Sequence, residues 1–445
     1  MGISLEEIAE NYLEDLIDRN LLRVDKRRSE GGVKTCRIHN MLLNFCKNEA
    51  RSKRENLFQE VKRCDGEFEP SGTSLEECRR LCIHSDVLKF PSSQPHGPRV
   101  HSFVCFSKEN ISLEGQDIST IPAAFKVLRV LEAKPIIFAR IPSNLCHLFH
   151  LRYLTLSLNL ATLPEFFSKL LNIQTLIVYT TSRTLEIKAN IWKMIHLRLV
   201  KTNASATMPK IEQSSKANEN LQTFNGISPQ SCTKEVFERA HNLKKLGIRG
   251  QLALLLDGNK RSLDNLAKLG QLVKLKLQND IYSNPPSKCQ LRGFPPLFKF
   301  PPKLKSLTLS YTFLDWCHIS ILGLLENLKV LKLKDNAFMG DCWEVAKTHF
   351  RGLEILHIGR TNLVTWLAFG YHFPKLMRLE LHNCDELREI PIGLADAPHF
   401  QALDLCHSKL AVASAKKIQK AKQKKQEEQN AKFFGFKLSI FPPDE

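Results

Sequence analysis

Side chains that could carry out chemistry are scattered along this sequence and form no compact group. Four of the 15 histidines, at positions 101, 147, 150 and 196, have no carboxylate or cysteine neighbour at the spacing of a metal site. No nucleophile stands beside a general base in an arrangement typical of covalent catalysis. We therefore assign no catalytic residue and no metal ligand, and we predict that the chain is not an enzyme.

The 13 cysteines do not form a disulfide pattern. None belongs to a C-x-x-C pair, and Cys105 and Cys406 occupy small apolar positions, where a free thiol packs as a hydrophobic group. Free thiols favour a reducing compartment. The first residues show no secretory signal, Glu6 breaks the myristoylation pattern, and no apolar run has the length of a membrane span. We expect a cytoplasmic protein.

The 445-residue chain has a net charge of +18, which favours acidic partners, anionic membranes or nucleic acid without choosing among them. The Ala-, Lys- and Gln-rich stretch 411–432 predicts a solvated helix, and 433–440 could add a cap strand. A peripheral membrane contact through these lysines is the alternative. Glu427 and Glu428 interrupt the lysines and no aromatic platform accompanies them, so nucleic-acid binding is not favoured.

A repeated apolar pattern, L-x-x-L-x-L, organises the chain from Val100 onward. Most of the 13 copies lie 22 to 25 residues apart, and they begin at Val100, Leu128, Leu151, Ile173, Leu197, Leu221, Leu243, Leu272, Leu304, Leu328, Leu353, Leu376 and Phe400. Alternate residues of a strand point to opposite faces, so the leucines turn inward and one copy cannot shield them alone. The pattern predicts an α/β leucine-rich-repeat solenoid, a horseshoe suited to recognition and not to catalysis.

The residues between the inward leucines are expected to face solvent on the concave side. Candidate partner-binding residues are therefore Arg152, Tyr153, Thr155, Lys329, Lys332, Glu380 and His382. On the convex side, apolar-Pro steps such as Ile141-Pro142 and Leu163-Pro164 recur, where proline fixes the turn. The proline-rich insert 281–302 interrupts the period, and both a functional loop and a tolerated insertion are consistent with it.

Before the repeats, the sequence predicts a helix, a two-stranded hairpin and a second helix. Residues 4–20 have helical apolar spacing with Ser4 as the N-cap, 21–24 and 33–38 are short strands around a glycine-containing turn, and a helix begins near Met41. This order is that of the end of a winged-helix domain. It gives four regions: a partial winged helix over 1–60, a linker and repeat N-cap over 61–98, repeats over 99–410, and a Lys-rich tail and cap over 411–445.

Two segments carry a family resemblance. Ile38-His39-Asn40-Met41-Leu42 resembles the Met-His-Asp motif of the NB-ARC module of plant intracellular immune receptors. The tail from Ser414 to Pro443 is similar to the C-terminus of the late-blight-resistance subgroup of coiled-coil receptors. The resemblance implies a defence receptor in which the repeats recognise a pathogen effector or a guarded host protein, or hold the receptor's own NB-ARC part.

The resemblance implies roles for two residues. His39 matches the histidine that senses the phosphate of bound ADP, and Asn40 replaces the motif aspartate, keeping its shape without its charge. No G-x-x-x-x-G-K-[ST] loop occurs in the sequence, so we expect the phosphate loop to lie before Met1, and neither ADP nor ATP to be held by this chain. The alternatives are a stand-alone repeat scaffold, such as a ubiquitin-ligase substrate adaptor, and a basic winged-helix protein that binds nucleic acid.

Overall fold

The computed structural model describes residues 5–28, 31–50, 57–65, 67–69, 75–84, 90, 93, 95–107, 111–113, 120–209, 211, 217–256, 262–280, 291, 300–345, 350–428 and 435–443. The chain forms two compact units, Met1–Leu154 (unit 1) and Thr155–Glu445 (unit 2). Within the described residues, no helix has both the length and the apolar character needed to cross a membrane.

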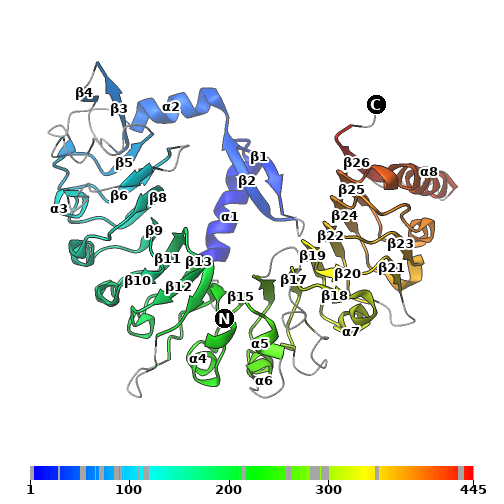
Figure 1. Ribbon diagram of the computed structural model, residues 1–445. Helices are drawn as coiled ribbons and strands as arrows, with labels where there is room; N and C mark the ends of the chain where they lie inside the picture. Colours follow the sequence, from blue (N-terminus) through cyan, green and yellow to red (C-terminus); the bar gives the residue numbers. More distant parts are fainter. Residues whose placement is uncertain are drawn as a thin grey trace. The chain divides into compact units, whose positions relative to one another are not determined.

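Unit 1 begins with the predicted helix, hairpin and helix: α1 (Leu5–Asp18), β1 (Leu22–Arg27), β2 (Val33–Ile38) and α2 (Asn40–Ala50) (Figure 1). The strands β1 and β2 pair antiparallel, with Leu22 opposite Ile38. An ion pair of 2.7 Å between Arg37 Nε and Asp25 Oδ1 spans the hairpin. The predicted winged-helix outline is therefore present.

The rest of unit 1 is a parallel ladder of short strands. In order, its elements are β3 (Gln59–Cys64), β4 (Glu67–Glu69), β5 (Arg80–Ile83), β6 (Ser102–Cys105), β7 (Ile111–Leu113), α3 (Thr120–Ala124), β8 (Val130–Phe138), the 3-10 helix η3 (Ser143–His147) and β9 (Tyr153–Leu158), in which the division between the units falls. The strands β3, β5, β6 and β8 pair parallel in that order. The ladder thus starts at β3, which precedes Val100. The repeat pattern in the sequence can be recognised only from Val100 onward.

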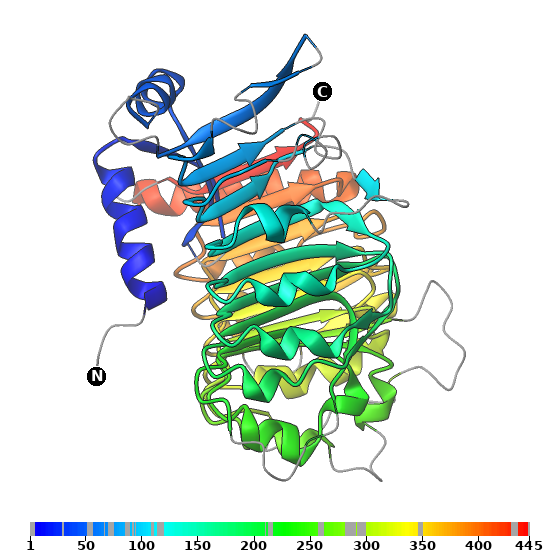
Figure 2. The same ribbon diagram turned by 90° about the vertical axis from the view of Figure 1, so that its left-hand side faces the viewer.

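Unit 2 is a longer parallel ladder that follows chain order. Its main strands are β11 (Thr175–Thr180), β13 (Leu199–Thr207), β14 (Thr223–Ile227), β15 (Lys245–Gly250), β16 (Lys274–Asn279), β17 (Ser306–Ser310), β19 (Val330–Lys334), β22 (Ile355–Gly359), β24 (Arg378–His382), β25 (Ala402–Cys406) and β26 (Lys437–Phe441). In Figure 2 the yellow and orange strands lie one above the next, like rungs. The predicted repeats from Ile173 to Phe400 each supply one of these strands.

The register explains the spacing of the leucines. Leu307, Leu331 and Leu356 are successive partners across the ladder, and each is completely buried. Each such leucine contributes about 1.5–3 kcal/mol through removal of its side chain from water. The residues that alternate with them lie on the opposite, open face of the sheet.

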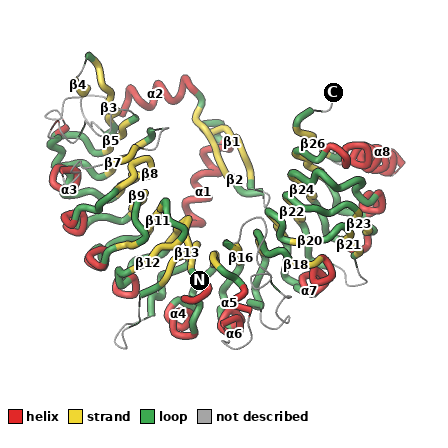
Figure 3. The backbone as a smooth tube through the Cα atoms, in the orientation of Figure 1, coloured by secondary structure: helices red, strands yellow, loops and turns green. Residues whose placement is uncertain are grey.

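Short helices and minor strands lie on the side of the unit 2 ladder opposite its open face (Figure 3). The helices are η4 (Glu165–Lys169), η5 (Ile191–Lys193), η6 (Pro229–Ser231), α4 (Lys234–Arg239), α5 (Ala253–Leu256), α6 (Ser262–Ala267), η10 (Trp316–Ile319), α7 (Ser320–Gly323), η11 (Gly370–His372), η12 (Ile392–Asp396), η13 (Lys409–Ala411) and α8 (Val412–Glu428). The minor strands are β10 (Thr162–Leu163), β12 (Thr184–Ile187), β18 (Leu314–Asp315), β20 (Phe338–Met339), β21 (Cys342–Glu344) and β23 (Thr365–Leu367). Pro142, Pro164 and Pro391 each stand directly before a 3-10 helix, as the apolar-Pro steps predict.

A stack of tryptophans fills the core on this side. Trp316, Trp343 and Trp366 come from successive repeats, and neighbouring rings are 4.9 Å apart at near-parallel angles. All three are at most 3% exposed. The stack repeats in step with the strands, so it ties the outer elements of adjacent repeats together.

The lysine-rich segment forms α8, and it is not fully solvated as predicted. Ala411, just before the helix, and Ala415 and Ile418 within it are completely buried, and Lys422 is 8% exposed. The spacing of these four residues places them on one helix face, and the helix packs against η12 and β26. The Lys422 Nζ donates to the carbonyl oxygen of Ala397 at 2.5 Å. The prediction of a solvated helix holds only for the other faces.

The strand β26 after the tail pairs parallel with β25, with Leu403 opposite Leu438. This strand agrees with the cap strand that the sequence suggests. Residues 429–434 lie outside the described part of the chain. So does most of the proline-rich insert 281–302, of which only Leu291 and residues 300–302 are described.

Candidate functional site

His39 and Asn40 lie at the start of α2 in unit 1, and both are exposed. The Nδ1 atom of His39 accepts a hydrogen bond from the Met41 backbone N–H at 3.4 Å, and the His39 carbonyl accepts one from the N–H of Leu43 at 2.8 Å. His39 therefore caps the helix, because its side chain accepts from the Met41 N–H, which has no partner within the first turn. One ring nitrogen is engaged in this way, which leaves Nε2 as the atom that could reach a phosphate.

Three candidate residues lie on β9 or directly before it. Arg152 is exposed, and Tyr153 donates its hydroxyl to Glu132 Oε2 at 2.8 Å. The expectation that Thr155 faces solvent is wrong: it is 2% exposed, and its hydroxyl has no hydrogen-bond partner among the described residues. The side chains of Leu154 and Leu156 are also buried, so this strand is covered on both faces.

Lys329 and Lys332 belong to a positively charged part of the unit 2 sheet. Lys329 is exposed and its Nζ lies 2.6 Å from Glu354 Oε1. Lys332 is half-buried on the open face of β19. Cationic residues recur on this face at alternate positions of β15, β16 and β19; we call them the basic strip, namely Arg249, Lys274, Lys276, Lys332 and Lys334.

Lys276 lies near other cations of the basic strip, of which Arg249 is also ion-paired, with its Nε 2.8 Å from Asp280 Oδ1. Burial lowers the pKa of Lys276 below its ordinary value, and repulsion from Lys334 and Arg249 lowers it further. Asp335 acts in the opposite direction without reversing the shift. Cations that lie near one another can be stabilised by a negatively charged ligand, so this surface fits an acidic partner.

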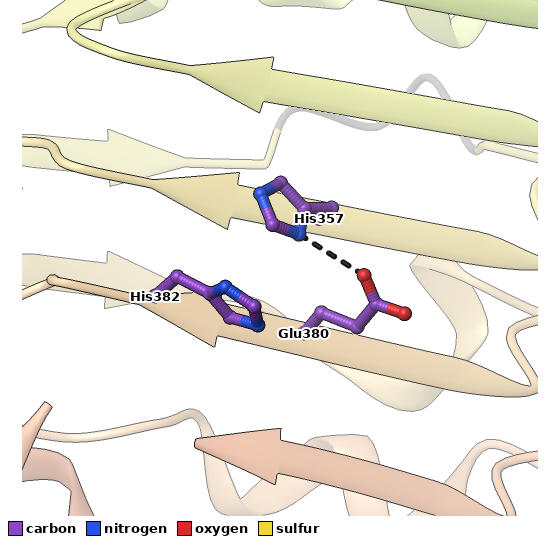
Figure 4. Close-up of side chains that lie close together, drawn as sticks. All are labelled: His357, Glu380 and His382. Atoms are coloured by element: carbon purple, nitrogen blue, oxygen red, sulfur yellow. Dashed lines mark hydrogen bonds and ion pairs between the residues drawn. The ribbon is translucent and has the colours of Figure 1, made fainter. Parts of the chain in front are cut away.

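Two other candidates, Glu380 and His382, meet a histidine that is not among the candidates predicted from the sequence. His357 Nδ1 lies 3.0 Å from Glu380 Oε2, and the rings of His357 and His382 are 4.7 Å apart between centroids. Figure 4 shows the three side chains on the same side of β22 and β24. His357 is 7% exposed, while Glu380 and His382 are half-buried. We call these three residues the His–Glu–His cluster.

The charged surroundings of the cluster are mixed. Arg378 Nη1 lies 3.9 Å from Glu380 Oε1, and Arg378 Nε lies 3.7 Å from Asp404 Oδ2. Burial lowers the pKa of His382, and repulsion from His357 adds to this effect, while Glu380 and Asp404 oppose it. His382 is therefore biased toward the neutral imidazole, the form whose nitrogen can accept a hydrogen bond or bind a metal.

A signal for His357 is present in the sequence. It stands between Leu356 and Ile358, the same repeat position as Lys332 in the preceding copy and Glu380 in the following one. Parallel strands in register place these three residues side by side. Alignment of the copies by their leucines, followed by a search across the copies, brings His357 and Glu380 together.

Comparison with known proteins agrees with this architecture. The chain matches the family described as "Leucine-rich repeat region" over residues 99–432, and the "Disease resistance protein Winged helix domain" over residues 1–46. It therefore belongs to the leucine-rich-repeat family, and its N-terminal segment is a winged helix of the disease-resistance type.

Curated relatives narrow the group. Over 471 residues the chain is 30% identical to a late blight resistance protein homolog of Solanum demissum, covering 99% of this chain and 34% of the relative. It is also 30% identical to a shorter homolog from the same species, covering 100% of this chain and 57% of that protein. The chain thus spans about a third to just over half of these relatives. The predicted resemblance to late-blight-resistance proteins is confirmed, and the scaffold alternative is not favoured.

A solved structure of an internalin from Listeria monocytogenes is also similar. It has a TM-score of 0.43 at 13% identity, and the alignment covers 76% of this chain and 83% of the internalin.

Proposed function

We propose that this chain acts in plant defence as the recognition part of an immune receptor, and that the basic strip binds an acidic protein surface. That surface belongs to a pathogen effector, to a guarded host protein, or to the nucleotide-binding part of the receptor. The observation that carries the proposal is the gathering of cations at alternate positions of β15, β16 and β19 on the open face of the sheet, with only β17 between β16 and β19. The match to disease-resistance proteins supplies the biological setting.

We further infer that the chain acts in recognition and catalyses no reaction. We also infer that it acts in the cytoplasm. It also does not hold ADP by itself, because its sequence contains no G-x-x-x-x-G-K-[ST] loop and Asn40 lacks the charge of the motif aspartate. In this view, His39 keeps the family's position and serves the helix.

The test is a chimera, expressed in leaf tissue, in which this chain replaces the matching segment of the shorter Solanum demissum homolog. The inner variant carries Lys276→Gln, Lys332→Gln and Lys334→Gln. If the basic strip restrains the receptor, this variant should cause cell death without a pathogen. If the basic strip detects a pathogen protein, the variant should lose the response to the pathogen.

The matched control removes the same amount of charge from another surface. It carries Lys416→Gln, Lys420→Gln and Lys424→Gln on α8, which alters total charge equally and leaves the basic strip intact. The proposal predicts that this control behaves like the unmodified chimera. If the inner variant and the control give the same response, the response depends either on total charge or on neither surface. Either result would contradict the proposed role of the basic strip. Pull-down of both variants with DNA tests the nucleic-acid alternative.

A further inference from the structure

We propose that the His–Glu–His cluster is a binding site for one divalent transition-metal ion of the Zn²⁺ class. The proposal stands apart from the proposed function, since it depends only on His357, Glu380 and His382 in unit 2. Each residue offers one ligand atom, and the three atoms lie within 4.8 Å of one another. Among the described residues, this is the one grouping of three such side chains.

The spacing is close to what a zinc ion requires. Zinc binds imidazole nitrogen and carboxylate oxygen at about 2.0–2.2 Å in tetrahedral geometry, which places two ligand atoms about 3.3 Å apart. The distance from His357 Nδ1 to Glu380 Oε2 is 3.0 Å. Figure 4 shows the His382 ring on the same side of the sheet, turned toward Glu380. The three ligand atoms lie within 4.8 Å of one another, so the proposal requires the third atom to move closer by side-chain rotation.

The backbone holds the three residues in place. Glu380 and His382 are two residues apart on β24, so they share a face, and His357 is the register partner of Glu380 on β22. The register partner of His382 is Gly359. A Cβ atom at position 359 would lie 3.0 Å from His357 Nε2, so the absence of a side chain leaves space for the imidazole. Sites built on rigid strands need little rearrangement to bind.

The donor set selects the class of metal. Two nitrogens and one oxygen suit Zn²⁺, Co²⁺ and Ni²⁺, whereas Ca²⁺ and Mg²⁺ prefer several oxygen ligands. Arg378 and Lys334 border the cluster, and their positive charge disfavours a cation held mainly by electrostatic attraction. A strong nitrogen donor pair is therefore needed. Three protein ligands leave a coordination position for water or for a side chain of a partner.

The test uses the full 445-residue chain after removal of metal with EDTA. Titration calorimetry with ZnCl₂ should show one equivalent bound, and Co²⁺ should give the visible absorption bands of a low-symmetry site. His382→Gln and Glu380→Gln should each weaken binding at least tenfold. The matched control is His196→Gln, which removes an exposed histidine from a different repeat of the same unit.

Two further measurements separate zinc binding at the cluster from zinc binding elsewhere on the chain. Exposed thiols such as Cys46 and Cys317 could bind zinc, so the titration is repeated after alkylation, and the cluster must keep its affinity. Zn²⁺ should raise the melting temperature of the chain and of the control, and leave those of the two cluster variants unchanged. Circular dichroism without metal shows whether the variants fold. Binding equal in all variants, or abolished by alkylation, would overturn the proposal.

Discussion

At the scale of single residues, Gly226 shows how closely neighbouring repeats approach each other. It lies in β14 with φ at +108°, between Asn225, which pairs with Gly247, and Ile227, which pairs with Ile248. Two residues of β14 therefore pair with adjacent residues of β15 across one extra position, which is a bulge. A Cβ atom at Gly226 would lie 2.5 Å from Thr202 Cγ2 and 2.9 Å from two backbone oxygens.

We expect Gly226→Ala to lower the free energy of unfolding by more than about 1 kcal/mol, because the new methyl group meets backbone atoms and the φ angle disfavours an L residue. Urea denaturation measures the change. The control is Gly270→Ala, since a Cβ atom there meets nothing within 4 Å. Its effect should stay within about 0.5 kcal/mol. Equal destabilisation by the two variants would contradict this account of the bulge.

Residue-level prediction from the sequence is uneven for physical reasons. Strand alternation places Glu380 and His382 on the open face, and the structure has them there. Alternation also places His357 on this face, but its contacts with Glu380 and His382 cross from one repeat to the next, and only the register of the copies reveals them. The prediction that Thr155 faces solvent fails because strand alternation gives the direction of a side chain but does not show which other residues cover it.

At the scale of elements, the turn after each strand repeats a backbone conformation that the sequence does not reveal. The residues directly after β17, β19, β22, β24 and β25 all have φ between 48° and 55°, and they are Tyr311, Asp335, Arg360, Asn383 and His407. Among residues other than glycine, asparagine, aspartate and histidine are enriched in this region, whereas tyrosine and arginine are not. Each of the five donates its N–H to a carbonyl of the next repeat. The stacking of repeats therefore imposes the turn, and local propensity could not predict it.

The buried face of α8 gives a prediction about pH. Burial lowers the pKa of Lys422 below its ordinary 10.5, and Lys425 lowers it further. The unfolded chain thus binds this proton more tightly than the folded chain, which costs stability at pH values below the folded pKa. The cost disappears as pH rises through the lowered pKa toward 10.5. The contribution of Lys422 to stability therefore increases with pH in that window.

Lys422→Met should remove this increase, because methionine fills a similar volume without a titrating group. The measurement is chemical denaturation from neutral pH to pH values near 10.5, the ordinary value for lysine. Lys424→Met on the exposed side of the same helix is the control and should retain the slope of the unmodified chain. An unchanged slope in Lys422→Met would mean that the Lys422 ammonium group stays hydrated.

At the scale of the whole molecule, the repeat pattern predicts the parallel ladder of strands, but it does not predict where the chain divides into two compact units. The apolar pattern predicts a strand in every copy from Val100 to Phe400, because burial of leucines at fixed spacing is a local property. The chain divides between Leu154 and Thr155, within β9, where the pattern runs without interruption. Compactness depends on packing over many repeats, which no single copy displays.

The two units make a prediction about how a core defect spreads. Leu307 is completely buried in β17 of unit 2, and truncation of a buried leucine to alanine costs about 2–5 kcal/mol. In a solenoid each repeat is stabilised mainly by its neighbours. Leu307→Ala should therefore accelerate amide hydrogen exchange most in β16, β17 and β19, less in β25, and least in β5 and β6 of unit 1. Mass spectrometry of peptic fragments measures this gradient.

The exposed Leu324→Ala is the control and should leave exchange nearly unchanged, since Leu324 is 46% exposed. Acceleration of equal size in both units would instead show that the whole chain unfolds as one cooperative body.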